Sequence, residues 1–331
     1  MLINIYNIFS PQEPVTEYEL NTVTYGLKPS SFLAQRTIHQ LVKDEGSSYP
    51  LASDVLLNHT FVDDIVAGAD CEDQANMLFH QLNELLMKGG FVLRKWSSSS
   101  PNLLLNVPSE HKETPRCIDN TNDLAYKVLG MQWNASSDSF TYLIVPFTGA
   151  VTKRSVLSYI ARMFDVCGWL TPFIFQSKHI MQLLHLAGVG YDELPSHLTQ
   201  VWLSHVSNVN VLSSINIPRL IPVNKSDQID VVGFCDASMK GYASVFYLRC
   251  IQTNSVSVHL LKAKSRVAPL KVISVPRLEL CAALLLSRLY KSLMSFWEKL
   301  PSHNVYLFSD SKIVLSWLKI PSYKLKTFVS N

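Results

Sequence analysis

The chain has 331 residues, of which 47% are hydrophobic and 17% are charged. This composition is typical of folded proteins and excludes an intrinsically disordered chain, and the length allows two or more domains. No apolar stretch reaches the length of a membrane span, and the first residues lack the basic region and cleavage site of a signal peptide. We therefore expect an intracellular protein, in the cytoplasm or the nucleus, without a membrane partner.

The cysteines and histidines are scattered along the chain. None of the six cysteines forms the close pair that zinc or redox chemistry requires, and no histidine pair lies near such a pair. We expect neither a zinc site nor a small-molecule cofactor. The cysteines expected to be buried thiols are Cys71, Cys117, Cys167, Cys235, Cys250 and Cys281.

The formal net charge of +3 is unevenly distributed. Counted from Lys, Arg, Asp and Glu, residues 1–230 carry −7 and residues 231–331 carry +10. A compact basic segment is typical of a surface that follows a phosphate backbone, and a solubilising surface is the alternative. We favour nucleic acid as the partner, because a solubilising surface usually mixes both signs.

The N-terminal part predicts an α+β arrangement of helix, hairpin and helix. Residues 30–46 (SSFLAQRTIHQLVKDEG) open with serines and end at a glycine, as a helix does. Residues 54–68 (DVLLNHTFVDDIVAG) predict two apolar strands around an acidic tip, Asp63 and Asp64. This tip is either a hairpin turn or a strand pair that holds metal ligands. Residues 73–90 (DQANMLFHQLNELLMKGG) predict a second helix that stops at two glycines.

The middle of the chain predicts helices without chemistry. Apolar positions in residues 153–207 recur at intervals of three and four, which more often reflects packing than a cofactor site. Stretches rich in Ser, Pro or charge predict loops at 95–102, 108–120 and 217–228. Because the last loop coincides with the change in charge, we expect a domain boundary near residue 228.

The C-terminal third predicts a mixed sheet with the order β-β-β-α-β-α. Its apolar residues alternate over several short segments, as in strands, and a helical pattern separates the third segment from the fourth. The expected elements are strands 230–238, 242–250 and 255–265, helix 275–300, strand 304–311 and a helix that begins at 312.

Three carboxylates in this part occupy positions where the pattern predicts burial. Asp236 lies among apolar residues of the first strand, Glu279 lies on the apolar face of the long helix, and Asp310 ends the fourth strand. Burying several carboxylates is costly, because each loses its hydration and like charges repel. A divalent cation removes both penalties, and oxygen ligands favour Mg²⁺ or Mn²⁺. Two such ions can activate a water and stabilise the leaving oxygen of a phosphodiester.

A simpler interpretation exists for each of these carboxylates. Asp236 and Asp310 would merely cap loops, and Glu279 would occupy the first helical turn, where the helix dipole favours an acid. Taken singly, each residue fits this interpretation better. Taken together in a basic segment, the three favour a metal site.

Three long motifs in the C-terminal third resemble a known family. Together they look like the ribonuclease H domain of Pao/BEL-type retrotransposon polyproteins. The resemblance implies an α/β ribonuclease H-like domain that cleaves the RNA strand of RNA–DNA hybrids and holds two Mg²⁺ ions through Asp236, Glu279 and Asp310. The motifs are GFCDASMKGYASVFYLR (233–249), APLKVISVPRLELCAALLLSRL (268–289) and LFSDSKIVLSWL (307–318).

The resemblance extends toward the N-terminus. The segments 21–41 (NTVTYGLKPSSFLAQRTIHQL) and 59–68 (HTFVDDIVAG) are similar to the reverse transcriptase palm of these elements, which implies that Asp63 and Asp64 descend from polymerase metal ligands. YKVLGMQWN (126–134) resembles the segment after the palm hairpin. RSVLSYIARMFDVCGWLTPFIFQSK, from 154 onward, is similar to the connecting region that carries a Pao peptidase label.

These likenesses predict three parts and several missing ones. We expect a partial palm over 1–135, a mainly helical connection over 136–228 and a truncated ribonuclease H-like domain over 229–331. The resemblance also implies a third palm carboxylate and a fourth nuclease ligand in polyprotein segments upstream and downstream. We therefore expect no polymerase activity, and weak nuclease activity or none.

Two other functions remain open at this point. One is a nucleic-acid-binding protein without catalysis, which would use only the basic surface. The other is an aspartic peptidase, which the family label alone implies. The sequence contains neither Asp-Thr-Gly nor Asp-Ser-Gly, the triplets that position the catalytic carboxylate of retroviral-type peptidases.

Overall fold

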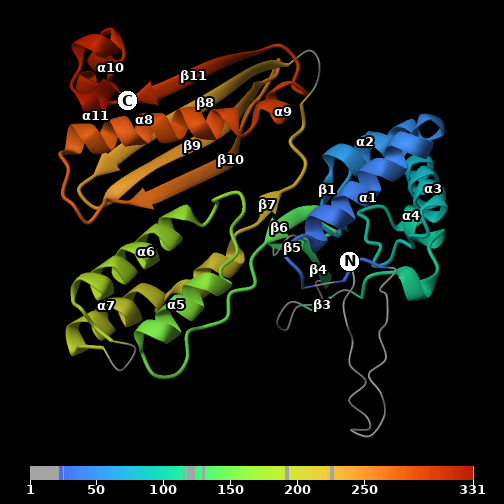
Figure 1. Cartoon of the computed structure of the whole chain (residues 1–331), viewed down its shortest axis with the longest axis horizontal. Helices are drawn as coiled ribbons and strands as arrows, with labels where there is room; N and C mark the ends of the chain where they lie inside the picture. Colours follow the sequence, from blue (N-terminus) through green and yellow to red (C-terminus); the bar gives the residue numbers. More distant parts are fainter. Residues whose placement is uncertain are drawn as a thin grey trace, which may run out of the picture. The chain divides into compact units, whose positions relative to one another are not determined.

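The computed structural model describes residues 22–24, 26–114, 116–117, 124–128, 131–190, 194–223 and 227–330. For 116–117, 124–125 and 127–128 the description covers the backbone. The chain forms two compact units, Met1–Val128 and Leu129–Asn331, and Figure 1 labels their elements. Within the described ranges, no helix combines the length and the apolarity needed to cross a membrane.

Three helices form the core of the first unit. Val42 of α1, Val55 and Leu56 of α2 and Leu82 and Leu85 of α3 are buried in one cluster. The predicted helices at 30–46 and 73–90 are present as α1 and α3. The unit contains helices α1 (Ser30–Glu45), η1 (Gly46–Ser48), α2 (Pro50–Asn58), α3 (Glu72–Lys88), α4 (Pro101–Leu105) and η2 (Ser109–His111), and strands β1 (Thr60–Phe61), β2 (Asp64–Ile65), β3 (Arg116–Cys117) and β4 (Leu124–Val128).

The predicted strand at the start of 54–68 is wrong. Residues 54–58 belong to the helix α2 instead. This helix begins with Pro50 at its first position, where a missing N–H is tolerated. The side-chain oxygen of Gln81 on α3 accepts hydrogen bonds from the backbone N–H groups of Leu51 and Ala52, at 2.9 and 3.3 Å. A partner from another helix therefore satisfies the start of α2, and this tertiary contact has no local sequence signal.

The first half of the second unit is mainly helical. The rings of Phe147, Tyr159 and Trp202 meet edge to face in its core, with centroids 5.4–5.8 Å apart. This cluster joins α5 to α7, and Ile180 and Leu184 of α6 are fully buried in the same core. The elements are β5 (Met131–Asn134), β6 (Ser139–Thr141), α5 (Lys153–Arg162), α6 (Thr171–Leu186), α7 (Ser196–Val206), η3 (Val209–Ser214) and β7 (Ile217–Pro218).

The second half of this unit contains a mixed four-stranded sheet, which confirms the predicted order of elements. Its strands lie in the order β10-β9-β8-β11; β8, β9 and β10 are antiparallel neighbours, and β11 is parallel to β8. Figure 1 shows α8 lying across the sheet. The elements are β8 (Gln228–Ser238), β9 (Gly241–Ile251), β10 (Val256–Val267), α8 (Val275–Lys291), α9 (Met294–Trp297), β11 (His303–Ser309), α10 (Lys312–Trp317), η4 (Ser322–Lys324) and α11 (Thr327–Ser330).

Strict alternation along β8 gives the sheet two different faces. Ile229, Val231 and Cys235 are buried and belong to the core that α8 covers. Phe234, on the opposite face, is 44% exposed. The face away from α8 therefore remains accessible within the described part of the chain.

The long helix predicted at 275–300 is interrupted. The helix α8 ends at Lys291, and the short helix α9 follows after Ser292. This break allows Trp297 to turn back and stack on Tyr290, with ring centroids 5.5 Å apart, while its indole N–H donates to the Tyr290 carbonyl at 2.9 Å. Burial of a large ring in the core therefore outweighs the helical pattern.

The loop before α6 is fastened to the free edge of β10. The backbone N–H of Ala263 donates to the Cys167 carbonyl at 2.8 Å, and Gln182 of α6 donates to the Ala268 carbonyl at 2.6 Å. The loop is itself ordered by Asp165, whose oxygens accept hydrogen bonds from the Tyr142 hydroxyl and two backbone N–H groups. The boundary predicted near residue 228 thus lies inside the second unit.

Replacing Gly168 with Ala should destabilise this attachment. Gly168 has a φ of +78°, and a Cβ there would overlap the carbonyl oxygen of Ala263. We expect a loss of about 2–4 kcal/mol, because backbone strain and a steric clash add up. Urea unfolding of the full chain measures this loss. Gly188→Ala is the control, since its φ is +65° but its Cβ would meet open space; a loss as small as the control's, about 1–2 kcal/mol, would contradict the predicted clash.

The stability of the helical half should fall as the pH drops from 7 to 5. His205 stacks on Phe173 at 4.2 Å and shares a 2.8 Å hydrogen bond with Ser177, and burial lowers its pKa. The unfolded chain therefore takes up a proton near the ordinary pKa of histidine, about 6.5, before the folded chain does, and stability is lost below that pH. Urea midpoints at both pH values test this. His205→Gln should reduce the pH dependence, whereas the exposed His197→Gln should not; equal dependence in both variants would contradict it.

Candidate functional site

Asp236 and Asp310 lie at the same end of the sheet. Asp236 is near the end of β8, and Asp310 directly follows β11, which runs parallel to β8. Ser309, the last residue of β11, pairs with Cys235. The two neighbouring parallel strands therefore deliver both carboxylates to one edge of the sheet.

Glu279 reaches this edge from α8. The hydroxyl of Ser311 donates to its carboxylate, and the same hydroxyl oxygen accepts a hydrogen bond from the Val314 N–H at 3.2 Å. Ser311 is thus the N-cap of α10 and is adjacent to Asp310 in the chain. Glu279 is fixed beside the strand end through this one contact. It is also the fifth residue of α8, so it does not occupy the first helical turn.

The predicted burial of these carboxylates is wrong. Asp236 and Asp310 are exposed, and Glu279 is half-buried. The reason is the alternation of β8: Cys235 points into the core, so Asp236 points away from α8. The thiol of Cys235 nevertheless responds to both acids, because burial raises its pKa most and the charges of Asp236 and Asp310 raise it further.

Asp236 and Asp310 line one pocket of about 700 Å³. The loop before α6 forms another wall of this pocket through Trp169, and the first two residues of α6, Thr171 and Pro172, continue this wall. Apolar and aromatic residues of the sheet line the remainder, including Phe234, Tyr247, Leu260 and Phe308. The helical half of the unit thus contributes directly to the site, and the sequence pattern gave no signal for this contribution.

The donor chemistry of the site suits a divalent cation, although its ligands are not gathered. Carboxylate oxygens are the ligands that Mg²⁺ and Mn²⁺ prefer, and no ion pair between described residues occupies Asp236 or Asp310. In the described ranges, however, no group of three or more His, Cys, Asp or Glu residues is arranged to hold a metal ion. Glu279 is engaged by Ser311 instead.

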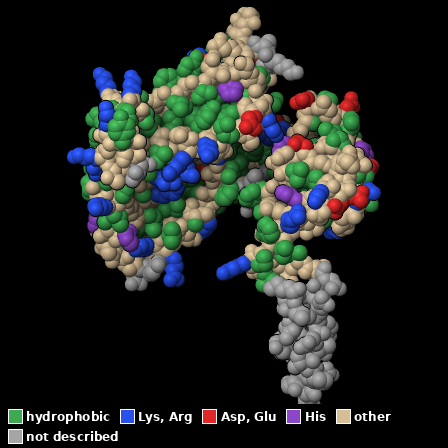
Figure 2. Space-filling model, turned by 45° about the horizontal axis from the view of Figure 1, so that its top comes forward, with side chains coloured by type: hydrophobic (Ala, Val, Ile, Leu, Met, Phe, Trp, Pro, Cys, Tyr) green, Lys and Arg blue, Asp and Glu red, His purple; other side chains and the backbone are tan. Residues whose placement is uncertain are grey.

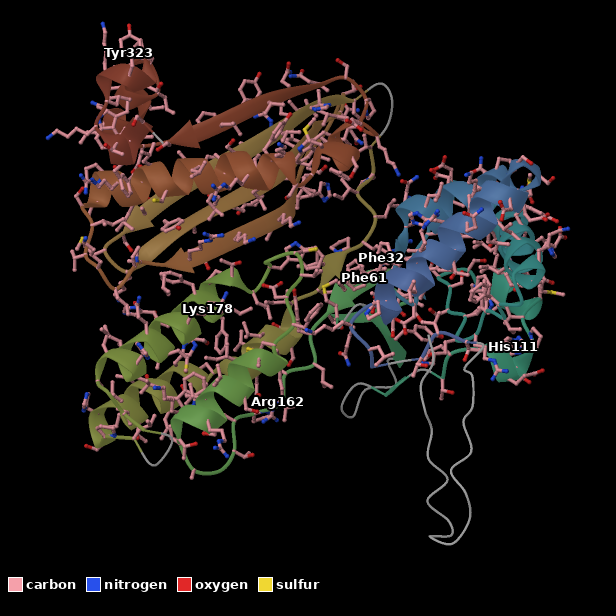
Figure 3. The ribbon with its side chains drawn as sticks, in the orientation of Figure 1. Phe32, Phe61, His111, Arg162, Lys178 and Tyr323 are labelled. Carbon is pink, nitrogen blue, oxygen red and sulfur yellow. The ribbon has the colours of Figure 1, made fainter. Side chains whose placement is uncertain are left out.

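Asp63 and Asp64 lie on a short exposed hairpin in the first unit. Thr60 pairs with Ile65 and Phe61 with Asp64, so the turn consists of Val62 and Asp63. Val62 has a φ of +57°, and Phe61, labelled in Figure 3, is 64% exposed. The predicted hairpin is present, but its strands have two residues each and its apolar side chains are not buried.

One carboxylate of β8 is fully buried, although the sequence pattern did not predict a role for it. Asp230 of β8 has no exposed surface and accepts two hydrogen bonds from the Arg249 guanidinium, at 2.5 and 3.0 Å. Asn304 of β11 donates to its other oxygen at 3.1 Å. The alternation of β8 places Asp230 on the face away from α8. Its register partner on β9 is Arg249, and this opposite charge was the one sequence signal that could have indicated a buried ion pair.

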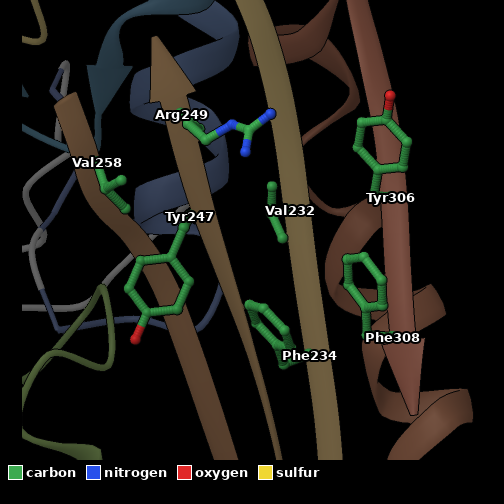
Figure 4. Close-up of a pocket in the computed structure, with 7 residues that line it drawn as sticks. All are labelled: Val232, Phe234, Tyr247, Arg249, Val258, Tyr306 and Phe308. Carbon is green, nitrogen blue, oxygen red and sulfur yellow. The ribbon is translucent and has the colours of Figure 1, made fainter. Parts of the chain in front are cut away.

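Arg249 borders an apolar patch on the same face. Figure 4 shows Val232 and Phe234 of β8, Tyr247 of β9, Val258 of β10 and Tyr306 and Phe308 of β11 around it, and the guanidinium reaches from β9 toward β8. The rings of Phe234 and Phe308 stack with centroids 5.3 Å apart. Since Phe234, Tyr247 and Phe308 also line the carboxylate pocket, the patch and the pocket are continuous.

The two partners of the Asp230–Arg249 pair should contribute unequally to stability. Arg249→Leu leaves a carboxylate buried with Asn304 alone, so we expect a loss of about 3 kcal/mol. Asp230→Asn leaves an arginine whose side chain is 46% exposed and can be hydrated, so we expect only about 1–2 kcal/mol. Urea unfolding of both variants measures the difference. An equal loss, or the reverse order, would contradict this account.

One family model matches most of the second unit. Residues 152–311 match the family model described as the Pao retrotransposon-like RNaseH-like domain. No curated protein matches the sequence. A crystal structure of prototype foamy virus protease-reverse transcriptase aligns with 14% identity and a TM-score of 0.21, covering 92% of this chain and 36% of that one. The family match supports a fragment of a Pao/BEL-type retrotransposon, in agreement with the resemblance of the sequence motifs to these elements.

Proposed function

We propose that the second unit cleaves the RNA strand of RNA–DNA hybrids with the help of a divalent cation. The observation that carries this proposal is the placement of Asp236 and Asp310, from two neighbouring parallel strands, in one pocket of a ribonuclease H-like domain. Exposed carboxylates beside an open pocket can reach a phosphodiester. The +10 charge of residues 231–331 favours a polyanionic substrate.

Three carboxylates would hold the cation. Asp236 and Asp310 present their oxygens to the pocket, and Glu279 would join them after its hydrogen bond with Ser311 is released. A bound Mg²⁺ or Mn²⁺ ion supplies a polarised water and stabilises the leaving oxygen of the cleaved ester. The protein itself contributes the fixed strand ends and the wall formed by Trp169, which together position the substrate strand.

A binding protein without catalysis is the second candidate. The contact between Glu279 and Ser311 favours it, because the carboxylate already has a structural role: it accepts a hydrogen bond from the hydroxyl that caps α10. In that case the basic surface alone would be functional. Hybrid binding that continues without any cleavage would identify this alternative.

Neither a polymerase nor a peptidase is proposed. Asp63 and Asp64 are exposed on a two-residue-strand hairpin, without a third carboxylate gathered beside them in the described part of the first unit. The sequence has no Asp-Thr-Gly or Asp-Ser-Gly triplet.

Neutralising the strand-end carboxylates should abolish cleavage. We expect Asp236→Asn and Asp310→Asn each to reduce Mg²⁺-dependent cleavage of a labelled RNA–DNA hybrid by at least about 100-fold, because each loses a charged ligand. Glu279→Gln should reduce it as well. A gel assay with the full chain, run with Mg²⁺ and with EDTA, measures these rates.

The matched control is Glu298→Gln. Glu298 is the other acidic residue after position 231, and it is exposed beyond the end of α9. Its replacement should leave cleavage unchanged. Absence of cleavage by the unaltered chain, or cleavage that survives Asp236→Asn, would refute the proposed activity.

A further inference from the structure

A row of cations lies along β10, the strand beside the connecting loop. Lys262, Lys264 and Arg266 occupy alternate positions, so their side chains leave the strand on the same face. Their register partners on β9 are Phe246, Ser244 and Tyr242, which belong to or contact the core under α8. The three residues, named here the β10 basic strip, therefore flank α8.

The charges of the strip are not neutralised within the described part of the chain. Among the described residues, no ion pair or hydrogen bond uses a side-chain nitrogen of Lys262, Lys264 or Arg266. Lys264 and Arg266 are exposed, and Lys262 is half-exposed. Neighbouring residues of the strip have Cα atoms about 6.6–6.8 Å apart along the strand, so their like charges repel one another.

Two half-buried thiols, Cys167 and Cys281, lie near cations of the strip. Burial raises the pKa of Cys281 on α8, while Arg266 and Arg288 act to lower it. Arg288 is exposed and lies two helical turns after Cys281, so both residues are on the same face of α8. Burial likewise raises the pKa of Cys167, against which Lys262 acts. Asp165 also influences Cys167, but its oxygens already accept hydrogen bonds from Tyr142 and two backbone groups. Asp165 is therefore a poor ion-pair partner for the cations of the strip.

The strip ends level with the candidate nuclease site. Ser265, beside Arg266, pairs with Ala243, and Ala243 in turn pairs with Asp236. The backbone of Asp236 is thus two strand spacings from β10, about 10 Å. The first turns of α8, which carry Glu279, follow β10 in the chain and start at this end of the sheet. The strip lies on the α8 face and the side chain of Asp236 on the opposite face, so a nucleic-acid strand bound along the strip would reach the carboxylates where it passes Glu279 and crosses the end of the sheet.

We propose that the β10 basic strip, together with Arg288, binds the phosphate backbone of the nucleic acid on which the Asp236 site acts. The choice of an RNA–DNA hybrid as ligand rests on the proposed function. An evenly spaced row of cations beside a protruding helix fits a linear polyanion, whereas a planar lipid surface would contact α8 first. On the face seen in Figure 2, Lys and Arg are more frequent than Asp and Glu over the second unit.

The test is the salt dependence of hybrid binding by the full chain. In the Asp236→Asn background, with EDTA present, binding of a short RNA–DNA hybrid is measured by fluorescence anisotropy at several salt concentrations. Each lost phosphate contact lowers the slope of log K against log [salt] by about 0.9. The triple variant Lys262→Gln, Lys264→Gln, Arg266→Gln should therefore lower the slope by about 2–3 units.

A matched variant carries the same loss of charge elsewhere. Arg162→Gln, Lys291→Gln and Lys319→Gln remove one arginine and two lysines at exposed positions of the same unit; Figure 3 labels Arg162 on α5. Its slope should change by less than one unit. Charge-preserving replacements, Lys262→Arg, Lys264→Arg and Arg266→Lys, should retain the original slope. Thermal melting checks that each variant is folded.

The outcomes separate this proposal from the proposed function. An equal change of slope in both triple variants, or no change in either, overturns the strip as the binding surface. Binding to vesicles that contain about 30% phosphatidylserine, an anionic lipid of cytoplasmic membrane surfaces, is measured for the same variants. If the strip variant loses vesicle binding but still binds the hybrid like the unaltered chain, the strip binds a membrane and the proposal is overturned. A reduced slope in the strip variant supports the strip even if the unaltered chain cleaves nothing, because the assay contains no metal.

Discussion

Alternation along β8 is the constraint on which the second unit depends. One set of its residues, including Ile229, Val231 and Cys235, must pack beneath α8, and this requirement fixes the register of β9 and β11 on either side. The other set then emerges on the opposite face, where Asp230, Phe234 and Asp236 lie. The packing of one face of β8 beneath α8 therefore places a buried ion pair, an aromatic patch and a candidate catalytic carboxylate on the other face.

The same constraint explains what the sequence could predict. The β-β-β-α-β-α order follows from long segments with a clear period of two or of 3.6, and all of them formed. Asp236 and Asp310 could be selected because acids are rare in this part of the chain. Their exposure could not be foreseen from neighbours alone, since apolar residues flank a strand position on both faces and only the register shows which face is covered.

Other features depend on contacts between distant segments. The helix α2 begins where Gln81 of α3 satisfies its backbone, and α8 stops where Trp297 finds space on Tyr290. The wall that Trp169 adds to the carboxylate pocket depends on the seating of Gly168 against Ala263. Local propensity contains no information about such partners. The start of α2 and the end of α8 were therefore predicted wrongly, and the pocket wall at Trp169 was not predicted.

The two edges of the sheet differ in how far they are covered by other parts of the chain. The outer edge of β10 is occupied by the loop at Cys167, which uses its backbone groups and blocks any further strand there. On β11, Tyr306, Leu307 and Phe308 are each 44–50% exposed, and in the described ranges the sheet order ends at this strand. The sheet can therefore grow in one direction only, and at high protein concentration self-association should begin at β11.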